Sequence, residues 1–136
     1  MKALVCSDFG STQDLSLETR DDLEPGAGEV LIEVKAAGVN FPDILTVQGK
    51  YQFKPPLPFV PGGEVSGVVT KLGEGVTTRK VGDEVVGMMQ VGGFATQAVT
   101  SEYTTFPKGN NMSYEQAAGF AVTYGTSYYA LKQKAQ

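Results

Sequence analysis

Turn-forming residues divide this chain into short segments, and this division constrains its fold more than any other feature. Seventeen glycines and seven prolines are spread over 136 residues, between runs rich in valine. Glycine accepts the backbone angles of tight turns and proline fixes φ, so neither favours long uninterrupted elements. A chain of this length has room for one domain with a real core but not for a second full domain. We therefore predict a mainly β domain, a small barrel or sandwich of short strands.

Several segments alternate apolar and polar residues, as strands with one buried face do. The clearest case is the segment in which Val30, Ile32 and Val34 share a face. Gly67 lies in the middle of another β-branched run and predicts a bulge or a close backbone approach there. The predicted strands are residues 2–7, 15–19, 29–36, 64–72, 84–88, 94–100 and 102–106, with a hairpin between the first two.

Helix signals interrupt this pattern near residue 40 and again towards the C-terminal end. Asn40 can act as an N-cap and Gly49 as a stop, which predicts a short helix over residues 41–48. Residues 113–116 fit a capping box and start a second short helix. Residues 123–135 carry aromatic and leucine side chains at helical spacing, which predicts a C-terminal helix.

Composition excludes several classes of function. The chain contains no histidine, which removes the commonest general base and the commonest zinc ligand. Its net charge of −4 comes from charges scattered along the chain, so we expect no nucleic-acid binding. The single cysteine, Cys6, cannot form an internal disulfide. No apolar run is long enough for a signal peptide or a membrane span, so we expect a soluble, cytoplasmic protein without membrane partners.

Four motifs occur together in order and spacing. They read AGVNFPD at residues 37–43, LPFVPGGE at 57–64, VGDEV at 81–85 and AAGF at 117–120. In this combination the chain strongly resembles the N-terminal half of zinc-independent medium-chain dehydrogenases/reductases, in the quinone oxidoreductase branch that includes zeta-crystallin. The resemblance covers nearly the whole chain.

The resemblance implies a GroES-like fold, which is a partly open β-barrel with a few short helices and a C-terminal helix. Residues 1–136 would be the catalytic, substrate-binding domain of an NADPH-dependent enzyme of two domains. Residues 123–136 would then begin the helix that connects to a nucleotide-binding Rossmann domain, which is absent from this chain. For the full-length protein the resemblance implies a homodimer.

No glycine-rich phosphate-binding turn replaces that second domain. The turns at residues 26–28 and 73–75 each begin as G-x-G, but Leu31 and Thr78 stand where a third glycine is needed. Neither turn is followed by a strong helix signal. We therefore expect both to be ordinary turns, and we expect this chain alone to hold NADPH poorly.

The same resemblance predicts that no metal is bound. Zinc-dependent relatives carry a cysteine where Asn40 stands, a histidine where Gly63 stands and a third ligand near Val122. Their structural-zinc loop would lie near residues 88–93, where this chain has no cysteine. Without soft ligands, nothing selective for Zn²⁺ is left.

Without a metal, the family reaction is hydride transfer from the nicotinamide to a quinone or a conjugated enone. The protein must then stabilise the developing anion with hydrogen-bond donors. The resemblance places Asn40 and Tyr51 as catalytic donors, and Asn40 with Thr126 beside the nicotinamide end of the cofactor. Phe41 and Phe53, with Tyr51, would form the apolar substrate pocket.

Each of these residues also has a purely structural interpretation. Asn40 can cap a helix through its side-chain oxygen, which leaves its NH₂ group free for a ligand. Tyr51 can simply pack its ring beside the proline loop. Asp43 is expected to brace the helix rather than to exchange protons. Glu64 is either support behind the site or a charge at a strand edge. Leu45 stands where many quinone oxidoreductases carry tyrosine, which leaves the substrate preference open.

Two other functions remain as alternatives. The chain can be a non-enzymatic GroES-like binding or assembly module that kept the barrel and lost catalysis. A weaker alternative, suggested by fold alone, is a co-chaperonin that forms ring-shaped oligomers. Codons for a glycine-rich strand, turn and helix downstream of Gln136 would favour the enzyme, whereas a stop codon would favour the binding module.

Overall fold

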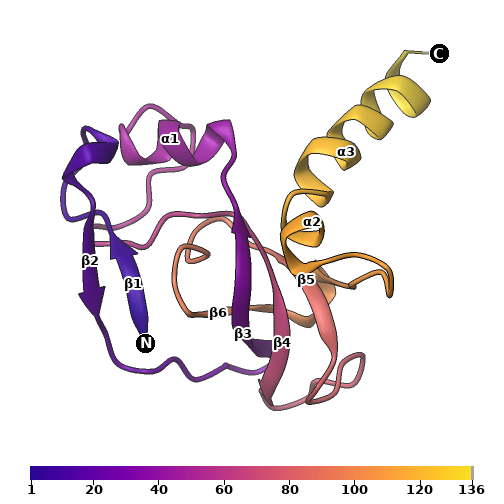
Figure 1. Ribbon diagram of the computed structural model, residues 1–136. Helices are drawn as coiled ribbons and strands as arrows, with labels where there is room; N and C mark the ends of the chain where they lie inside the picture. Colours follow the sequence, from indigo (N-terminus) through magenta and orange to yellow (C-terminus); the bar gives the residue numbers. More distant parts are fainter. Residues whose placement is uncertain (136) are drawn as a thin grey trace.

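A five-stranded antiparallel sheet forms the body of the computed structural model, which describes residues 1–135 (Figure 1). Its strand order is β6-β3-β4-β5-β7, so β3 and β4 are central and β6 and β7 form the edges. Short strands with tight turns between them are what the glycine and proline pattern predicts. The strands are β3 (Glu29–Gly38), β4 (Glu64–Leu72), β5 (Glu84–Met88), β6 (Gln97–Ser101) and β7 (Thr105–Pro107).

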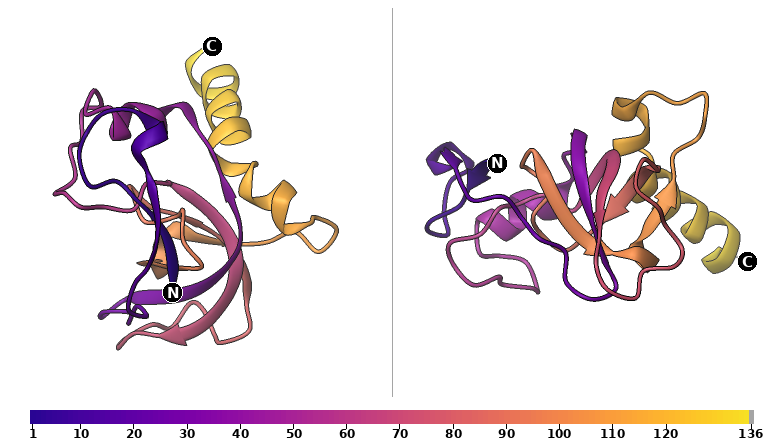
Figure 2. Two further views of the ribbon diagram at one scale, coloured as in Figure 1. Left: turned by 60° about the vertical axis from the view of Figure 1, so that its left-hand side comes forward. Right: turned by 90° about the horizontal axis from the view of Figure 1, so that it is seen from below.

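The N-terminal hairpin forms a second, two-stranded sheet from β1 (Lys2–Val5) and β2 (Ser16–Thr19), as predicted. Isolated bridges from Ala3 to Ala95 and from Cys6 to Phe59 attach it to the segments around the larger sheet. The two sheets curve around a common interior without closing into a barrel (Figure 2). The prediction of a mainly β, partly open barrel is therefore confirmed.

The central strands bend where the sequence places a glycine between β-branched residues. The register of β3 against β4 shifts between Val34 and Ala36, opposite Gly67. A Cβ atom at Gly67 would lie 2.0 Å from the carbonyl oxygen of Glu33, so only glycine allows this approach. Both predictions for Gly67, a bulge between β3 and β4 and a close backbone contact, are confirmed.

Aliphatic side chains from four strands fill the interior of the sheet. Burial of one such side chain stabilises the fold by about 1.5–3 kcal/mol. Ile32 and Val85, which come from β3 and β5, are almost completely buried. The central cluster consists of Val30, Ile32, Val65, Val69, Val85 and Ala98.

Three α-helices lie toward one end of the sheets (Figure 1). They are α1 (Phe41–Val47), α2 (Tyr114–Ala118) and α3 (Ala121–Tyr128), and α3 continues into a π-helical stretch, η3 (Tyr129–Lys134). The predicted capping box starts α2, since Ser113 Oγ accepts from the Gln116 N–H at 3.1 Å and Gln116 Oε1 from the Ser113 N–H at 3.0 Å. In both views of Figure 2, α3 projects away from the sheets. None of the helices in residues 1–135 has the length and apolar character needed to cross a bilayer.

Several predicted boundaries need correction, and β3, for example, ends at residue 38 instead of 36. Residues 102–104 form a 3₁₀ turn, η2 (Glu102–Thr104), rather than the first half of a strand, because Ser101 Oγ caps the Tyr103 N–H at 3.2 Å. β6 starts at residue 97 instead of 94, since the backbone of Phe94 bonds to Leu4 and Pro61. β1 ends at residue 5 instead of 7, and the C-terminal helix begins at 121 instead of 123. A further 3₁₀ turn, η1, spans Thr12–Asp14.

The two G-x-G segments are ordinary turns, as predicted, and they pack against each other. The Gly28 N–H donates to the Glu74 carbonyl and the Gly73 N–H to the Glu29 carbonyl, each at 2.8 Å. A Cβ atom at Gly73 would lie 1.7 Å from the Gly26 carbonyl oxygen, and neither turn begins a helix.

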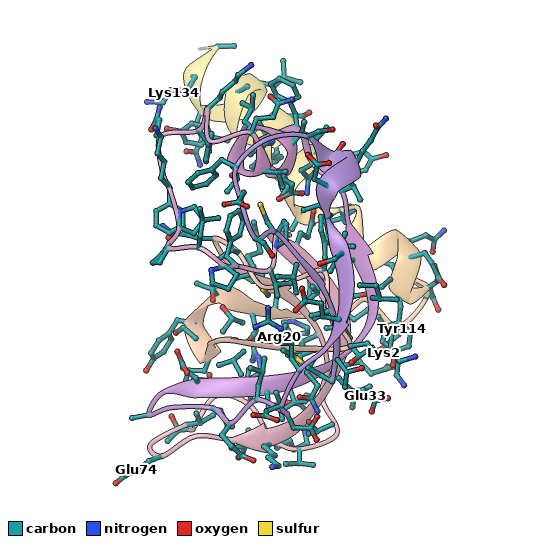
Figure 3. All side chains as sticks on the ribbon, turned by 90° about the vertical axis from the view of Figure 1, so that its left-hand side faces the viewer. Lys2, Arg20, Glu33, Glu74, Tyr114 and Lys134 are labelled. Carbon is teal, nitrogen blue, oxygen red and sulfur yellow. The ribbon has the colours of Figure 1, made fainter. Side chains whose placement is uncertain are left out.

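Figure 3 shows Glu74 at one end of the molecule and Lys134 at the other.

Candidate active-site cleft

A cleft of about 310 Å³ opens between α1, the loop that follows it, the end of β5 and the beginning of α3. Its wall combines polar groups with apolar side chains, which is the usual make-up of a site for a small organic ligand. The lining residues are Asn40, Pro42, Asp43, Thr46, Tyr51, Phe53, Gly63, Met88, Met89, Gln90 and Val122.

Hydrogen bonds at the start of α1 hold one wall of the cleft in place. Asn40 occupies the N-cap position with extended backbone angles, and the Asp43 carboxylate accepts from its backbone N–H at 2.8 Å. The Thr46 hydroxyl donates to the Pro42 carbonyl at 2.8 Å, which supplies a partner for a carbonyl of the first turn. Asp43 therefore braces this helix, as the sequence predicts.

Asp43 is also buried, and its environment affects its charge. Burial raises the pKa of its carboxyl above the ordinary value, and the nearby negative charge of Glu64 acts in the same direction. Backbone hydrogen bonds from Asn40 and Gly63 oppose this rise in pKa. Desolvation is the largest of these effects, as expected for a carboxyl group removed from water.

Glu64 lies behind the cleft wall and is fully buried. Its Oε2 accepts from the Asn40 side-chain amide at 3.2 Å. Its Oε1 accepts from the backbone N–H groups of Ala121, at 2.7 Å, and Val122, at 3.1 Å. The interpretation of Glu64 as a strand-edge charge is therefore wrong, and the carboxylate supports the site from within the protein. Three N–H donors satisfy a buried charge that would otherwise be very unfavourable.

The structure brings together three of the five predicted site residues. Asn40, Tyr51 and Phe53 line the same cleft, and Tyr51 and Phe53 are about 38% and 37% exposed. Phe41 is 70% exposed and does not line the cleft. Thr126 lies on the exposed part of α3, outside the lining. Phe41 and Thr126 can contact a ligand only if it extends beyond the cleft.

The three positions that the resemblance associates with zinc ligands also converge. Asn40, Gly63 and Val122 come from separate segments and line the same cleft. Within residues 1–135, no three histidine, cysteine, aspartate or glutamate side chains gather as a metal site would require. Amide and hydroxyl groups, together with the carboxyl group of Asp43, provide the polar chemistry of the wall.

Sequence reasoning missed the far wall of the cleft. Met88 is the last residue of β5, and Met89 and Gln90 follow it. The sequence predicts a strand that ends at Met88 and a loop without cysteine after it, but no contribution of these residues to a site. Two consecutive methionines at the end of a strand were an available signal, because the flexible, polarizable side chain of methionine adapts to varied apolar ligands.

Comparison with known proteins supports the family resemblance. The alcohol dehydrogenase GroES-like domain family matches residues 26–130. A quinone oxidoreductase-like protein 2 homolog of Nematostella vectensis is 41% identical over 136 residues, which cover 98% of this chain and 37% of that protein.

Solved structures give the same result. The human synaptic vesicle membrane protein VAT-1 homolog-like protein superposes with a TM-score of 0.95 at 35% identity, over 99% of this chain and 44% of that one. A mycobacterial protein complexed with NADPH gives 0.92 at 33% identity, over 98% of this chain and 42% of that one. The chain thus spans about two fifths of the length of these proteins. It belongs to the alcohol dehydrogenase GroES-like domain family, in the quinone oxidoreductase branch of the medium-chain dehydrogenases/reductases.

Proposed function

We propose that this chain is the substrate domain of an oxidoreductase that uses NADPH to reduce quinones or conjugated enones without zinc. The observation that carries the proposal is the cleft in which two hydrogen-bond donors, Asn40 and Tyr51, lie beside an apolar wall. The names of its relatives support the class of substrate, since one is a quinone oxidoreductase-like protein. A structural neighbour with bound NADPH supports the cofactor.

The donors suit a carbonyl oxygen that gains negative charge. Hydride addition to a quinone or an enone leaves a quinol anion or an enolate, and preorganised N–H and O–H donors stabilise such anions. An amide NH₂ carries two hydrogens, and Asn40 gives one of them to Glu64. The second N–H of Asn40 and the hydroxyl of Tyr51 are the donors that we assign to the substrate oxygen.

The apolar part of the cleft suits a planar ring or a conjugated chain. Phe53 from the loop after α1, with Met88 and Met89 from the end of β5, lines the cleft. Apolar surroundings exclude water and thereby strengthen each hydrogen bond to the developing anion. These side chains orient the acceptor while the polar groups hold its oxygen.

NADPH supplies the hydride in this proposal. Asn40, together with Thr126 on α3, would contact its nicotinamide end. The two G-x-G turns are occupied by their mutual packing, since the backbone of Gly26 fills the space beside Gly73. They do not fit a pyrophosphate, so we assign phosphate binding to residues of the full-length enzyme outside this chain.

Hydrogen bonding would replace metal polarisation at this site. Asn40, Gly63 and Val122 stand at the positions that the family resemblance associates with zinc ligands, and they line one cleft. A neutral amide at the first position can donate to a carbonyl oxygen, whereas glycine and valine offer no side-chain ligand.

The test joins this chain to the nucleotide-binding domain of its NADPH-binding mycobacterial relative. NADPH oxidation is followed with 1,4-benzoquinone and with trans-2-hexenal. We expect turnover with at least one acceptor, and we expect Asn40→Ala to lower kcat by about a hundredfold, as for loss of one oxyanion donor. The exposed Asn110→Ala serves as the matched control and should retain full activity.

NADPH binding to the chimera, measured by fluorescence, separates two kinds of negative result. A chimera that binds NADPH but reduces neither acceptor contradicts the proposal and favours the non-enzymatic binding module. Equal kcat for Asn40→Ala and Asn110→Ala would remove Asn40 from the reaction.

A further inference from the structure

Glu64 connects the cleft to the start of helix α3 through a single carboxylate. Its two oxygens serve different parts of the molecule, although both are completely buried. Oε2 faces the Asn40 amide at 3.2 Å, and Oε1 faces the first backbone N–H groups of α3, at 2.7 and 3.1 Å. Asn40 comes from the segment before α1, and α3 begins about eighty residues later in the chain.

Helix α3 depends on Glu64 for its N-terminal cap. The first N–H groups of a helix have no partner inside it, and here the N-cap residue is Phe120, which offers no side-chain acceptor. Glu64 supplies both the acceptor and a negative charge at the positive end of the helix dipole. The side chains of residues 123–134 are exposed, so their burial against the sheets does little to fix this helix.

The same carboxylate determines which way the Asn40 amide faces. A carboxylate only accepts hydrogen bonds, so the NH₂ group of Asn40, and not its oxygen, must point to Glu64. A glutamine at this position could still accept from the Ala121 and Val122 N–H groups through its oxygen. Its NH₂ group would then face Asn40, and the Asn40 amide would have to turn over to accept from it.

We propose that Glu64 is a positioning residue that fixes the Asn40 amide as a donor in the cleft and ties this orientation to the first turn of α3. The use of that donor on a substrate oxygen rests on the proposed function. The orientation itself does not, so the two can be tested separately.

The variant that tests the orientation is Glu64→Gln, and Glu102→Gln is its matched control. Glu102 is also buried, and its Oε2 accepts from the Thr77 and Thr78 N–H groups at 3.1 and 2.8 Å and from the Thr78 hydroxyl at 2.6 Å. It clamps a loop by the same chemistry but bonds to neither Asn40 nor α3.

Nuclear magnetic resonance of the isotope-labelled chain provides the readout. In Glu64→Gln we expect the Asn40 side-chain NH₂ signals to move, while the Ala121 and Val122 amides stay protected from exchange to within about tenfold. In Glu102→Gln all of these signals should keep their positions. Unmoved Asn40 NH₂ signals in Glu64→Gln would overturn the inference, whatever the protein catalyses.

The same variants in the chimeric enzyme test the consequence for catalysis. We expect Glu64→Gln to lower kcat/KM for 1,4-benzoquinone by about tenfold or more, as for loss of a hydrogen bond in the transition state, and Glu102→Gln to leave it unchanged. An inactive wild-type chimera would count against the proposed function, and the resonance result would still decide the inference.

If Glu64→Gln fails to fold, Asn40→Ala examines the same contact from its other end. Removal of the amide frees one oxygen of the shared carboxylate, so the Ala121 and Val122 backbone amide signals should shift. If both signals keep their wild-type positions, the link between the cleft and α3 does not exist.

Discussion

Gly38→Ala tests how closely the end of β3 must approach helix α2. A Cβ atom at residue 38 would lie 2.3 Å from the Ala118 carbonyl oxygen and 3.1 Å from Glu64 Oε2, whereas real Cβ contacts essentially never fall below 3.0 Å. The obstacle at Ala118 is backbone, which cannot rotate away as a side chain can. Either α2 or the end of β3 must move.

The expected destabilisation lies at the upper end of what overpacking produces, about 3 kcal/mol. For a chain of this size, that corresponds to a fall in Tm of about 12 °C. The start of α3 follows α2 closely, so the hydrogen bonds from Ala121 and Val122 to Glu64 should also lengthen. The site should therefore be disturbed together with the fold.

Urea unfolding followed by circular dichroism measures the effect, and Gly125→Ala is the matched control. Apart from its chain neighbours and the nearby backbone of the helix itself, no atom lies within 4 Å of a Cβ placed at Gly125, which is inside α3. There the same substitution should stabilise the protein by up to about 1 kcal/mol through helix propensity. A Gly38→Ala protein within about 0.5 kcal/mol of wild type would refute the steric argument.

Three further predictions concern the cleft and the buried carboxylates. Tyr51→Phe in the chimera should lower kcat for 1,4-benzoquinone by about tenfold with little change in Tm, and an unchanged kcat would remove the hydroxyl from the reaction. Folding raises the pKa of Asp43 above its ordinary value of 3.8, so the contribution of this carboxyl group to the free energy of unfolding is fully present at low pH. That contribution is lost as the pH rises through the folded-state pKa of Asp43. Urea titrations should therefore show wild type losing stability relative to Asp43→Asn over that range, and parallel pH profiles would contradict this. Hydrogen bonds from Thr78 lower the pKa of Glu102, so its stabilisation should be present above pH 4.5 and lost as pH falls through its folded-state pKa. The advantage of wild type over Glu102→Gln should shrink in acid, and an advantage that grows in acid would show that the sign is wrong.

Most of the fold follows from local sequence signals. Alternating residues gave β3, and the Asn40 N-cap with the Gly49 stop gave α1 to within one residue. These signals suffice because propensity and turn chemistry act over a few residues. The prediction of a strand that starts at Glu102 was wrong, although the composition of this segment resembles that of a strand. A serine cap and a buried carboxylate accompany a 3₁₀ turn there.

The residues of the candidate site were predictable only through the family resemblance. Asn40, Tyr51 and Phe53 were named in advance and line the cleft, and their chemical roles stay predictions. The environment of Glu64 could not be predicted, because its partners Ala121 and Val122 are 57 and 58 residues away along the chain. A charged residue that opens an apolar β-branched run was the one available sign of burial.

Because α3 projects from the sheets, a small rotation at Glu64 would displace the far end of this helix by a larger distance. Residues 121–134 continue as one helical rod that leaves the sheets (Figure 2), and at about 1.5 Å per residue the rod is about 20 Å long. Its hydrogen bonds to Glu64 lie at its first turn, so a rotation of the helix about this turn would have its pivot beside the cleft. A rotation of about 10° at the pivot would carry the far end through about 4 Å, roughly the width of a side chain. A shift too small to notice in the cleft would thus be easily measured with a spectroscopic label near Lys134.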